Sequence, residues 1–337
     1  MSKTITVSQV QSEMNGYVEE NRKVVSTQIQ GGLINPLSKY CKTLTKINGE
    51  YPSFHSVLGH VVQGFSNEWT ELGTVQMKHK LMKSYKMKVN FGFKPSDILG
   101  SYLAKMYEEG KELIDNPISK YIIEEELIPQ VSDDVDSLVI SGQYDATKLD
   151  EFGFAMDGIE TVVKNNLTNT DNPYYKIPVD AFTDTNIVDQ ITVFERNLPK
   201  KFKGKMKAIF MSENNAERYS LRYDDQYGQN NKVNGANNKT RLGKRDVIGL
   251  AGLSDDVVFA FPDKSLVELM DIVENPATIT DVQKLDYKVK VFMEFTLGYD
   301  FPINEVVCVA NFTDVTKGLG DADKMKLYYP KEEGVIA

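Results

Sequence analysis

The first 31 residues carry apolar positions spaced as on one face of an α-helix. Gaps of three and four residues separate Val7, Val10, Met14, Tyr17, Asn21 and Val24, with Asn21 as the one polar member. Gly31 and Gly32 follow, and glycine is a common helix terminator. The pattern predicts an amphipathic helix ending at these glycines, which must bury its apolar face against the body of the chain or another copy.

Residues 75 to 92 alternate between apolar and polar positions with a period of two. The apolar set is Val75, Met77, His79, Leu81, Tyr85, Met87, Val89 and Phe91. The stretch from Gln76 to Ser96 contains no acidic residue. It contains six lysines, namely Lys78, Lys80, Lys83, Lys86, Lys88 and Lys94. This predicts two strands joined by a short turn, with one apolar and one lysine-rich face. A two-stranded ribbon is marginally stable alone and needs a surface to lie on.

A long helix is predicted over about residues 117–141. Its apolar stripe is Ile123, Leu127, Val131, Val135 and Leu138. Proline at position 117 suits the first turn, Pro129 predicts a bend, and Gly142 ends the pattern. The outer face is acidic, with Glu124, Glu125, Glu126, Asp133, Asp134 and Asp136. A shorter helix is expected after Ser96, with its apolar face in residues 98–106.

From about residue 151 the pattern of apolar positions predicts mixed α/β structure. Residues 207–211 form an apolar run that leads into a helix capped by Ser212, and a further helix is expected over 184–198. The helix after Ser212 carries three tyrosines, Tyr219, Tyr223 and Tyr227. They are predicted interface residues, because tyrosine combines contact area with a polar tip. Two alternating runs, 289–297 and 306–312, predict a terminal hairpin or meander with its turn at 298–300.

Composition narrows the class of protein. The chain has 337 residues with 41% hydrophobic content and a net charge of -9, so it has material for a sizeable core. An acidic chain lacks the basic footprint of a dedicated DNA-binding protein. The two cysteines, Cys41 and Cys308, form no metal-binding pattern and are expected as reduced thiols. No signal peptide and no membrane-spanning apolar run are expected.

Candidate chemistry is sparse. The three histidines, His55, His60 and His79, match no ligand spacing, and no nucleophile or phosphate-loop motif is present. The basic run KKFKGKMK at 200–207 is either a phosphate contact or an exposed loop. The sequence therefore predicts no catalytic residue, no cofactor and no metal.

The order of the parts resembles the major capsid protein of tailed phages, with the Hong Kong 97-type capsid fold of α+β class. Residues 1–50 look like the N-terminal arm, and 51–92, closed by KMKVNF, like the extended loop. The peripheral domain would take residues 93–155 and 286–337. Its spine helix would be SKYIIEEELIPQVSDDVDSLVISG, and its returning strands would be VKVFMEFTLGYDFPINEVVCVANF. KAIFMSENNAERYSLRYDD and VIGLAGLSDDVVFAFP look like parts of the axial domain, 156–285.

The resemblance implies a structural protein of the virion. It would assemble with itself into hexamers and pentamers of an icosahedral shell around double-stranded DNA, in the host cytoplasm and without membrane association. Portal, scaffold or decoration proteins would be its other partners. An acidic subunit suits DNA that must be packed and released.

A charge hypothesis adds detail to the subunit contacts. Because one segment is rich in lysine and the next in acids, Lys78, Lys80, Lys83, Lys86 and Lys88 are expected to lie over a neighbour's spine helix. The acidic candidates there are Glu124, Glu125, Asp133 and Asp134. Exposed pairs contribute about 0–1 kcal/mol each, so they would set register more than strength.

Three alternatives stay open. The same fold could enclose protein as an encapsulin-type nanocompartment, and the chain could be a tail or collar component. A soluble enzyme with an unfamiliar site is the third, and the scattered histidines and absent motifs count against it.

Overall fold

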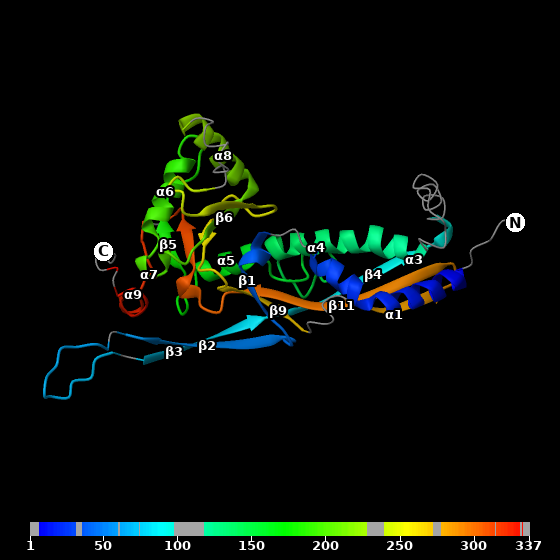
Figure 1. Ribbon diagram of the computed structural model, residues 1–337, viewed down its shortest axis with the longest axis horizontal. Helices are drawn as coiled ribbons and strands as arrows, with labels where there is room; N and C mark the ends of the chain where they lie inside the picture. Colours follow the sequence, from blue (N-terminus) through cyan, green and yellow to red (C-terminus); the bar gives the residue numbers. More distant parts are fainter. Residues whose placement is uncertain are drawn as a thin grey trace.

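The computed structural model shows an elongated molecule with two sheets and a projecting ribbon (Figure 1). It describes residues 7–31, 36–59, 61–73, 75–97, 118–227, 239–271, 278–313, 315–330 and 332. The short helix predicted after Ser96 falls largely outside these residues. So does residue 117, where the long helix was expected to begin.

The first sheet is built around one long strand. This strand, β11 (Lys288–Asp300), pairs antiparallel with β4 (Tyr85–Phe93), β10 (Thr278–Leu285) and, at residues 297–300, β9 (Leu266–Met270). Strand β1 (Cys41–Leu44) then pairs parallel with β9 and follows a 3₁₀ turn, Pro36–Tyr40. The alternating pattern predicted for 289–297 is therefore a central strand.

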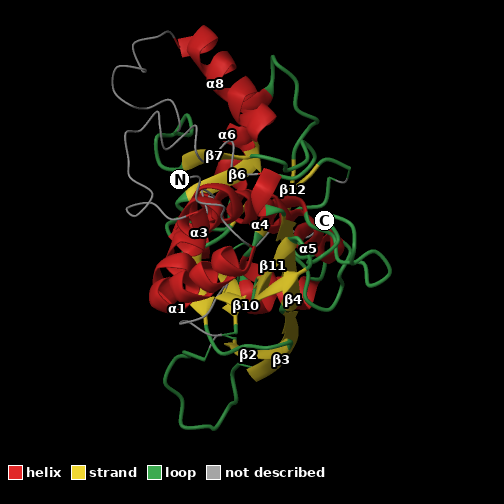
Figure 2. Ribbon diagram, turned by 90° about the vertical axis from the view of Figure 1, so that its right-hand side faces the viewer, coloured by secondary structure: helices red, strands yellow, loops and turns green. Residues whose placement is uncertain are grey.

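Helices cover one face of this sheet. They are α1 (Val7–Gly31) and a continuous helix made of α3 (Ile118–Lys120), a π-helical segment (Tyr121–Leu127) and α4 (Ile128–Ser141). Figure 2 shows both on the same side of β10, β11 and β4. Val10 and Met14 are fully buried in the core that these elements share. The predicted helix at 7–31 is confirmed, and so is the burial of its apolar face at Val10 and Met14.

Pro129 and Gly142 shape the long helix. Proline has no N–H and its ring crowds the carbonyl four residues earlier, and here the preceding seven residues adopt the wider π-helical turn. At the other end, the Gly142 N–H donates to the Leu138 carbonyl over 3.0 Å. A Cβ on Gly142 would lie 2.6 Å from the carbonyl oxygens of Leu138 and Met156, so only glycine allows this close crossing.

The second sheet is fully interior. Its order is β5 (Tyr175–Pro178), β12 (Cys308–Asn311), β8 (Phe259–Ala260), β6 (Ala208–Ser212) and β7 (Asp246–Leu250). Phe210 and Phe259 point into the core shared with the first sheet, whereas Ile209 and Met211 point to the opposite side. There they meet α6 (Ile187–Asn197), α8 (Glu213–Tyr227) and α9 (Ala322–Tyr328), while α5 (Ile159–Leu167) joins the first core. The predicted strand-to-helix step and the Ser212 cap are confirmed, since Ser212 Oγ accepts from the Asn215 N–H at 3.1 Å.

The pairing predicted within residues 75–92 is wrong. Strand β3 (Val75–Lys83) pairs with β2 (Glu50–Leu58), and β4 pairs with β11. Only Ser84 separates β3 from β4, and the shortest common hairpin loops contain two residues. Ser84 is instead fixed by its N–H donating to the Gly49 carbonyl over 2.7 Å, so the chain leaves the ribbon there and enters the first sheet.

The terminal hairpin is also wrong. Strand β11 continues through Gly298 and Tyr299 to Asp300, because its last residues pair with β9. A Cβ at Gly298 would lie 2.3 Å from the Lys83 carbonyl oxygen, so this glycine serves a close backbone crossing and not a turn. The next strand, β12, belongs to the second sheet.

These pairings place three segments differently from the predicted division of the chain. β4 lies in the first sheet although 51–92 was expected as the extended loop. β9 and β10 also lie in the first sheet, within the range 156–285 expected as axial. β12 and α9 pack with the second sheet, within the range 286–337 expected as peripheral. Sequence patterns locate strands but do not reveal which sheet each strand joins.

Candidate assembly surfaces

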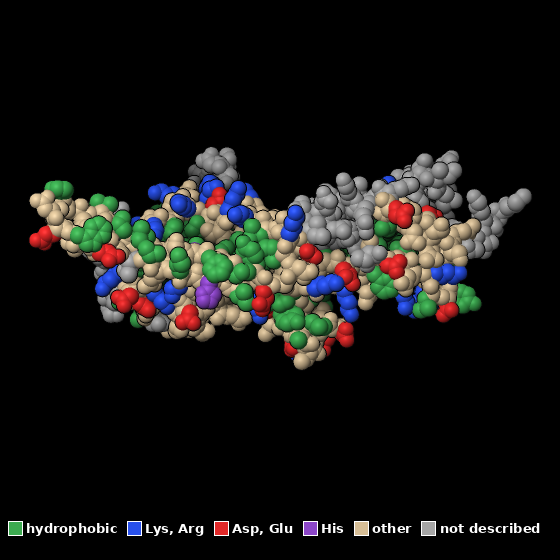
Figure 3. Space-filling view, turned by 90° about the horizontal axis from the view of Figure 1, so that it is seen from below, with side chains coloured by type: hydrophobic (Ala, Val, Ile, Leu, Met, Phe, Trp, Pro, Cys, Tyr) green, Lys and Arg blue, Asp and Glu red, His purple; other side chains and the backbone are tan. Residues whose placement is uncertain are grey.

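The ribbon of β2 and β3 exposes a continuous set of apolar side chains. Its strands pair antiparallel from Glu50 opposite Lys83 to Leu58 opposite Val75. The exposed apolar residues of the strands and their connecting loop are Phe54, Leu58, Val61, Val62, Phe65, Trp69, Leu72, Val75, Met77 and Leu81. Figure 3 shows hydrophobic side chains gathered along this part of the molecule, on the face seen from below. Exposed apolar surface of this extent marks an interaction site.

Lys80 fastens the opposite face of the ribbon to the body. Its ammonium group donates to Asp300 Oδ1 at 2.5 Å, the Phe301 carbonyl at 2.9 Å and Asn304 Oδ1 at 2.8 Å. Burial raises the pKa of the Asp300 carboxyl above its usual value, although the Lys80 ammonium opposes that shift. Asn304 is itself fully buried and donates to the Asn172 carbonyl at 2.9 Å. Lys80 thus joins the ribbon to the segment that links the two sheets.

This position corrects the role expected for Lys80. It is engaged within its own chain and is unavailable as a contact to a neighbour. The direction of the ribbon was also unexpected, because in β3 the lysine side packs toward the body and Val75, Met77 and Leu81 face outward. Alternation determines which residues share a face, and tertiary packing determines where that face points.

A second polar contact holds the ribbon from strand β2. His55 Nε2 lies 2.8 Å from the Tyr328 hydroxyl of α9. Burial lowers the pKa of His55, with Glu305 acting to raise it and Lys78, its cross-strand partner, acting to lower it. No sequence pattern indicates this contact, since the two residues are 273 positions apart.

The other lysines of the predicted set are divided between strand β3 of the ribbon and strand β4 of the first sheet. Lys86 pairs with Glu294 at 2.7 Å on the exposed face of the first sheet. Lys88 and Asp134 line one groove of about 520 Å³ between β4 and α4, within a single chain. Lys83 is exposed opposite Glu50, and Lys78 is half-buried.

The acids of the long helix differ in their hydrogen-bond partners and in their exposure to solvent. Glu124 is half-buried and accepts a hydrogen bond from the Tyr17 hydroxyl of α1, so it helps to hold α1 in place, and its contact with a neighbour's lysines stays a prediction. Burial, followed by this carboxylate, raises the pKa of Tyr17. Asp134 accepts from Gln130 Nε2 at 2.8 Å, and Asp133 is exposed. Glu125 is half-buried.

The tyrosines of α8 form a graded series from core to surface. Tyr219 is only 1% exposed, so its predicted role as an interface residue is corrected to a core role. Its ring centroid lies 6.0 Å from that of Tyr223, which lies 5.0 Å from Tyr227. Tyr227 is exposed, with the Arg241 guanidinium 5.1 Å from its ring. Tyr227 is therefore the exposed member of the series, and Tyr223 is half-buried.

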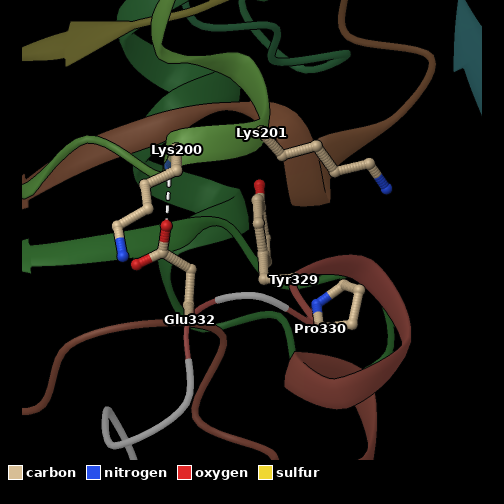
Figure 4. A pocket seen from close by; sticks show the side chains of 5 residues that line it. All are labelled: Lys200, Lys201, Tyr329, Pro330 and Glu332. Carbon is tan, nitrogen blue, oxygen red and sulfur yellow. Dashed lines mark hydrogen bonds between the residues drawn. The ribbon is translucent and has the colours of Figure 1, made fainter.

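The basic run 200–207 is engaged within the chain. In Figure 4 the Glu332 carboxylate points at the Lys200 backbone N–H, which donates to it over 2.6 Å. The Lys201 ammonium donates to the Tyr328 carbonyl at 3.0 Å, and Lys207 pairs with Asp263 at 2.5 Å. Burial lowers the pKa of Lys201. These contacts favour the structural interpretation of the run over a row of free phosphate contacts.

One cluster has the residue types of a serine-lysine active site. Lys164 Nζ lies 3.3 Å from Ser254 Oγ and 2.8 Å from Glu160 Oε1. Burial lowers the Lys164 pKa, but the hydrogen bonds and charges of Glu160 and Asp256 outweigh it and raise the pKa overall. A charged lysine is a poor general base, so the cluster is a structural network between α5 and the 254–256 turn.

The side chains of the described part of the chain include no group of three or more His, Cys, Asp or Glu residues placed to hold a metal ion. Within the same residues, no helix combines the length and apolar character that crossing a membrane requires.

Comparison with known proteins identifies the fold. No family model matches the chain, and no curated protein matches its sequence. A capsid chain of an empty GTA particle superposes with a TM-score of 0.52 at 12% identity, covering 82% of this chain and 96% of that one. A chain of the satellite phage P4 procapsid including the size determination (Sid) protein gives 0.51 at 9% identity, covering 86% and 99%. The fold is that of phage capsid proteins.

The capsid chain of a native GTA particle agrees, with a TM-score of 0.51 at 10% identity over 82% of this chain and 90% of that one. The predicted α+β class and its similarity to the Hong Kong 97-type capsid fold are therefore confirmed. The sequence reasoning missed Asp300, Asn304 and Tyr328, which hold the ribbon. One signal was present, since Asp300 follows directly on the apolar run of β11.

Proposed function

We propose that this chain is a major capsid protein of a tailed phage. It assembles into hexamers and pentamers of an icosahedral shell that encloses the double-stranded DNA genome. The observation that carries the proposal is the ribbon, which presents its apolar residues to solvent and is fixed to the body at its base by Lys80. In a phage-capsid fold, such a surface is buried when copies associate.

Assembly contacts follow from the residues that stay exposed. Lys83 and Lys88, which are exposed, would meet the exposed Asp133 and the half-buried Asp134 of a neighbour, with Lys78, Lys86, Glu124 and Glu125 as weaker candidates. Such exposed pairs contribute about 0–1 kcal/mol each and act on register. Tyr223 and Tyr227 would extend the contact from α8.

Other partners belong to the same proposal. The portal, scaffold or decoration proteins of the particle would bind the shell, and DNA would be enclosed without sequence-specific contacts. A net charge of -9 limits adhesion of the subunit to packed DNA. The site of action would be the virion, after assembly in the host cytoplasm, with no membrane step and no catalysis.

The test is particle formation by the purified chain, alone and co-expressed with its genomic neighbours. Light scattering and negative-stain microscopy should reveal closed shells, or rings of five and six subunits. A compact monomer under all conditions would overturn the proposal and return the soluble-enzyme alternative. Open tubes or single rings would instead indicate a tail or collar component.

The cargo separates the genome shell from an encapsulin-type nanocompartment. Particles from infected cells should contain DNA that resists nuclease until the shell is opened. Particles filled with protein and free of DNA would favour the nanocompartment.

A further inference from the structure

The tip of the ribbon combines exposed aromatic and acidic side chains. Phe65 is 97% exposed and Trp69 is 93% exposed, and Glu68 and Glu71 flank the tryptophan. The segment from 61 to 73 contains no lysine or arginine. Within the described residues, neither carboxylate has an ion-pair partner. Gln63 Nε2 donates to the Thr70 carbonyl at 2.7 Å, which holds the loop in a defined shape.

The base of the ribbon carries a pocket of the complementary type. Its volume is about 340 Å³, and it opens between β1, β9, the start of β2 and the turn after Phe301. Leu44, Pro302 and Ile303 contribute apolar lining, and Lys42 and Lys264 are its two charged members. Both lysines are exposed, and neither has an ion-pair partner among the residues that the structure describes. The surrounding segment 36–49 holds three lysines and no acid.

The tip cannot reach the pocket of its own chain. Strands β2 and β3 each have nine residues, which separates their two ends by about 30 Å in extended conformation. Figure 1 shows the tip and the base at opposite ends of the ribbon. Lys80 and His55 both hold the ribbon against the body, so the direction of the ribbon is fixed. An occupant with the chemistry of the tip must therefore come from another molecule.

We propose that the Phe65–Leu72 tip of one copy docks in the Lys42 and Lys264 pocket at the ribbon base of a second copy. The aromatic rings of the tip pack against the apolar part of the pocket lining. Glu68 and Glu71 meet the two lysines at its rim. The contact is head to tail, because tip and pocket are different surfaces, and repetition of such a contact generates closed rings. This inference rests on the proposed self-assembly and names the surfaces that meet.

Charge reversal and rescue test the contact. Glu68→Lys with Glu71→Lys, or Lys42→Glu with Lys264→Glu, should raise the concentration for half-assembly by about tenfold or more, and most strongly at low salt. Combining all four substitutions should restore assembly. As a matched control, Asp180→Lys with Asp184→Lys makes the same change of charge at exposed positions of the loop before α6, outside the proposed contacts, and should assemble normally. Normal assembly of either reversed pair, or failure of the fourfold variant to recover, would overturn the docking.

A disulfide separates this docking from the proposed function. Chains with Thr70→Cys mixed with chains carrying Ser265→Cys, a pocket residue, should form cross-linked pairs on oxidation. Both chains carry Cys41→Ser, and Asp150→Cys replaces Ser265→Cys in the control. Closed shells without the cross-link would overturn the docking and leave the shell intact. Cross-linked pairs that never form shells or rings would support the docking and count against the capsid.

Discussion

The second sheet and the ribbon are both β-structures, but they obtain their stability from different sources. All five residues of β6 are buried, and Phe210 stacks on Phe259 and Phe261 with centroid distances of 5.3 and 5.0 Å. In the ribbon, two strands pair only with each other and most of their apolar side chains face solvent. The sheet is complete within one chain, whereas the ribbon needs polar anchors at its base and a partner along its length.

This comparison explains how one chain can fold alone and still be committed to association. Apolar burial stabilises the second sheet by roughly 25 cal/mol per Å² removed from water. Apart from Met82 and Val57, most apolar side chains of the ribbon gain little of that until another surface covers them. Substitutions in the two regions should therefore affect different measurements.

The largest effect on folding is expected in the second sheet. Phe210→Ala should lower the free energy of unfolding by about 3–5 kcal/mol, because it leaves a cavity inside an aromatic stack. Urea unfolding of the dissociated chain measures this. Phe152→Ala, at a position that is 65% exposed, is the control and should change the value by less than about 0.5 kcal/mol. Equal losses in the two variants would contradict the assignment of the core.

The next effect is expected at the ribbon anchor. Lys80→Met removes three hydrogen bonds and leaves the Asp300 carboxylate buried without its cation, at a cost of about 3–5 kcal/mol near neutral pH. Hydrogen exchange of the ribbon amides and urea unfolding measure it. Lys78→Met removes a half-buried lysine of the same strand and should have a much smaller effect.

The pH dependence of that loss has a defined sign. Folding raises the pKa of Asp300, so protonation of this carboxyl stabilises the folded chain. Its contribution to the free energy of unfolding is fully present below the unfolded pKa of 3.8 and is lost as the pH rises through the folded pKa. Removing Lys80 raises the folded pKa further. The deficit of Lys80→Met relative to the parent chain should therefore shrink in acid, where Asp300 is protonated in both. A deficit independent of pH would show that the ion pair is not its cause.

Trp69→Ala should separate folding from assembly. At 93% exposure the side chain contributes little to the isolated chain, so its unfolding should change by less than about 0.5 kcal/mol. Particle yield, measured by light scattering, should fall. Thr70→Ala, the adjacent position in the same loop, keeps the aromatic ring and is the control. A destabilised monomer with normal particle yield would show that Trp69 acts in folding and not in assembly.

The smallest effect is expected at His55. Folding lowers its pKa below 6.5, so the stability linked to the neutral ring is present above that value and is lost as pH falls through the folded pKa. Exchange of the β2 amides, corrected for intrinsic rates, should be faster at about pH 5 than at about pH 7.5. His55→Gln does not titrate and should lose this difference. An unchanged difference in that variant would assign the effect to another group.

Local features of the fold were predictable because short-range physics sets them. The helix at 7–31, the end of the long helix at Gly142 and the Ser212 cap follow from spacing and backbone chemistry within a few residues. The candidate surfaces were only partly predictable. The ribbon segment was located, but Lys80 and Tyr219 were assigned to the surface and belong to contacts within the chain.

By itself, the sequence determined the alternation in β3, β4 and β11 and the apolar faces of α1 and α4, since periods of 2 and 3.6 residues are local properties. Only the tertiary structure decided which strands pair and which way each face points. Ser84 and Gly298 illustrate the reason, because their roles arise where segments about 200 residues apart cross within van der Waals contact. Such crossings depend on the packing of the whole chain and leave no periodic trace along it.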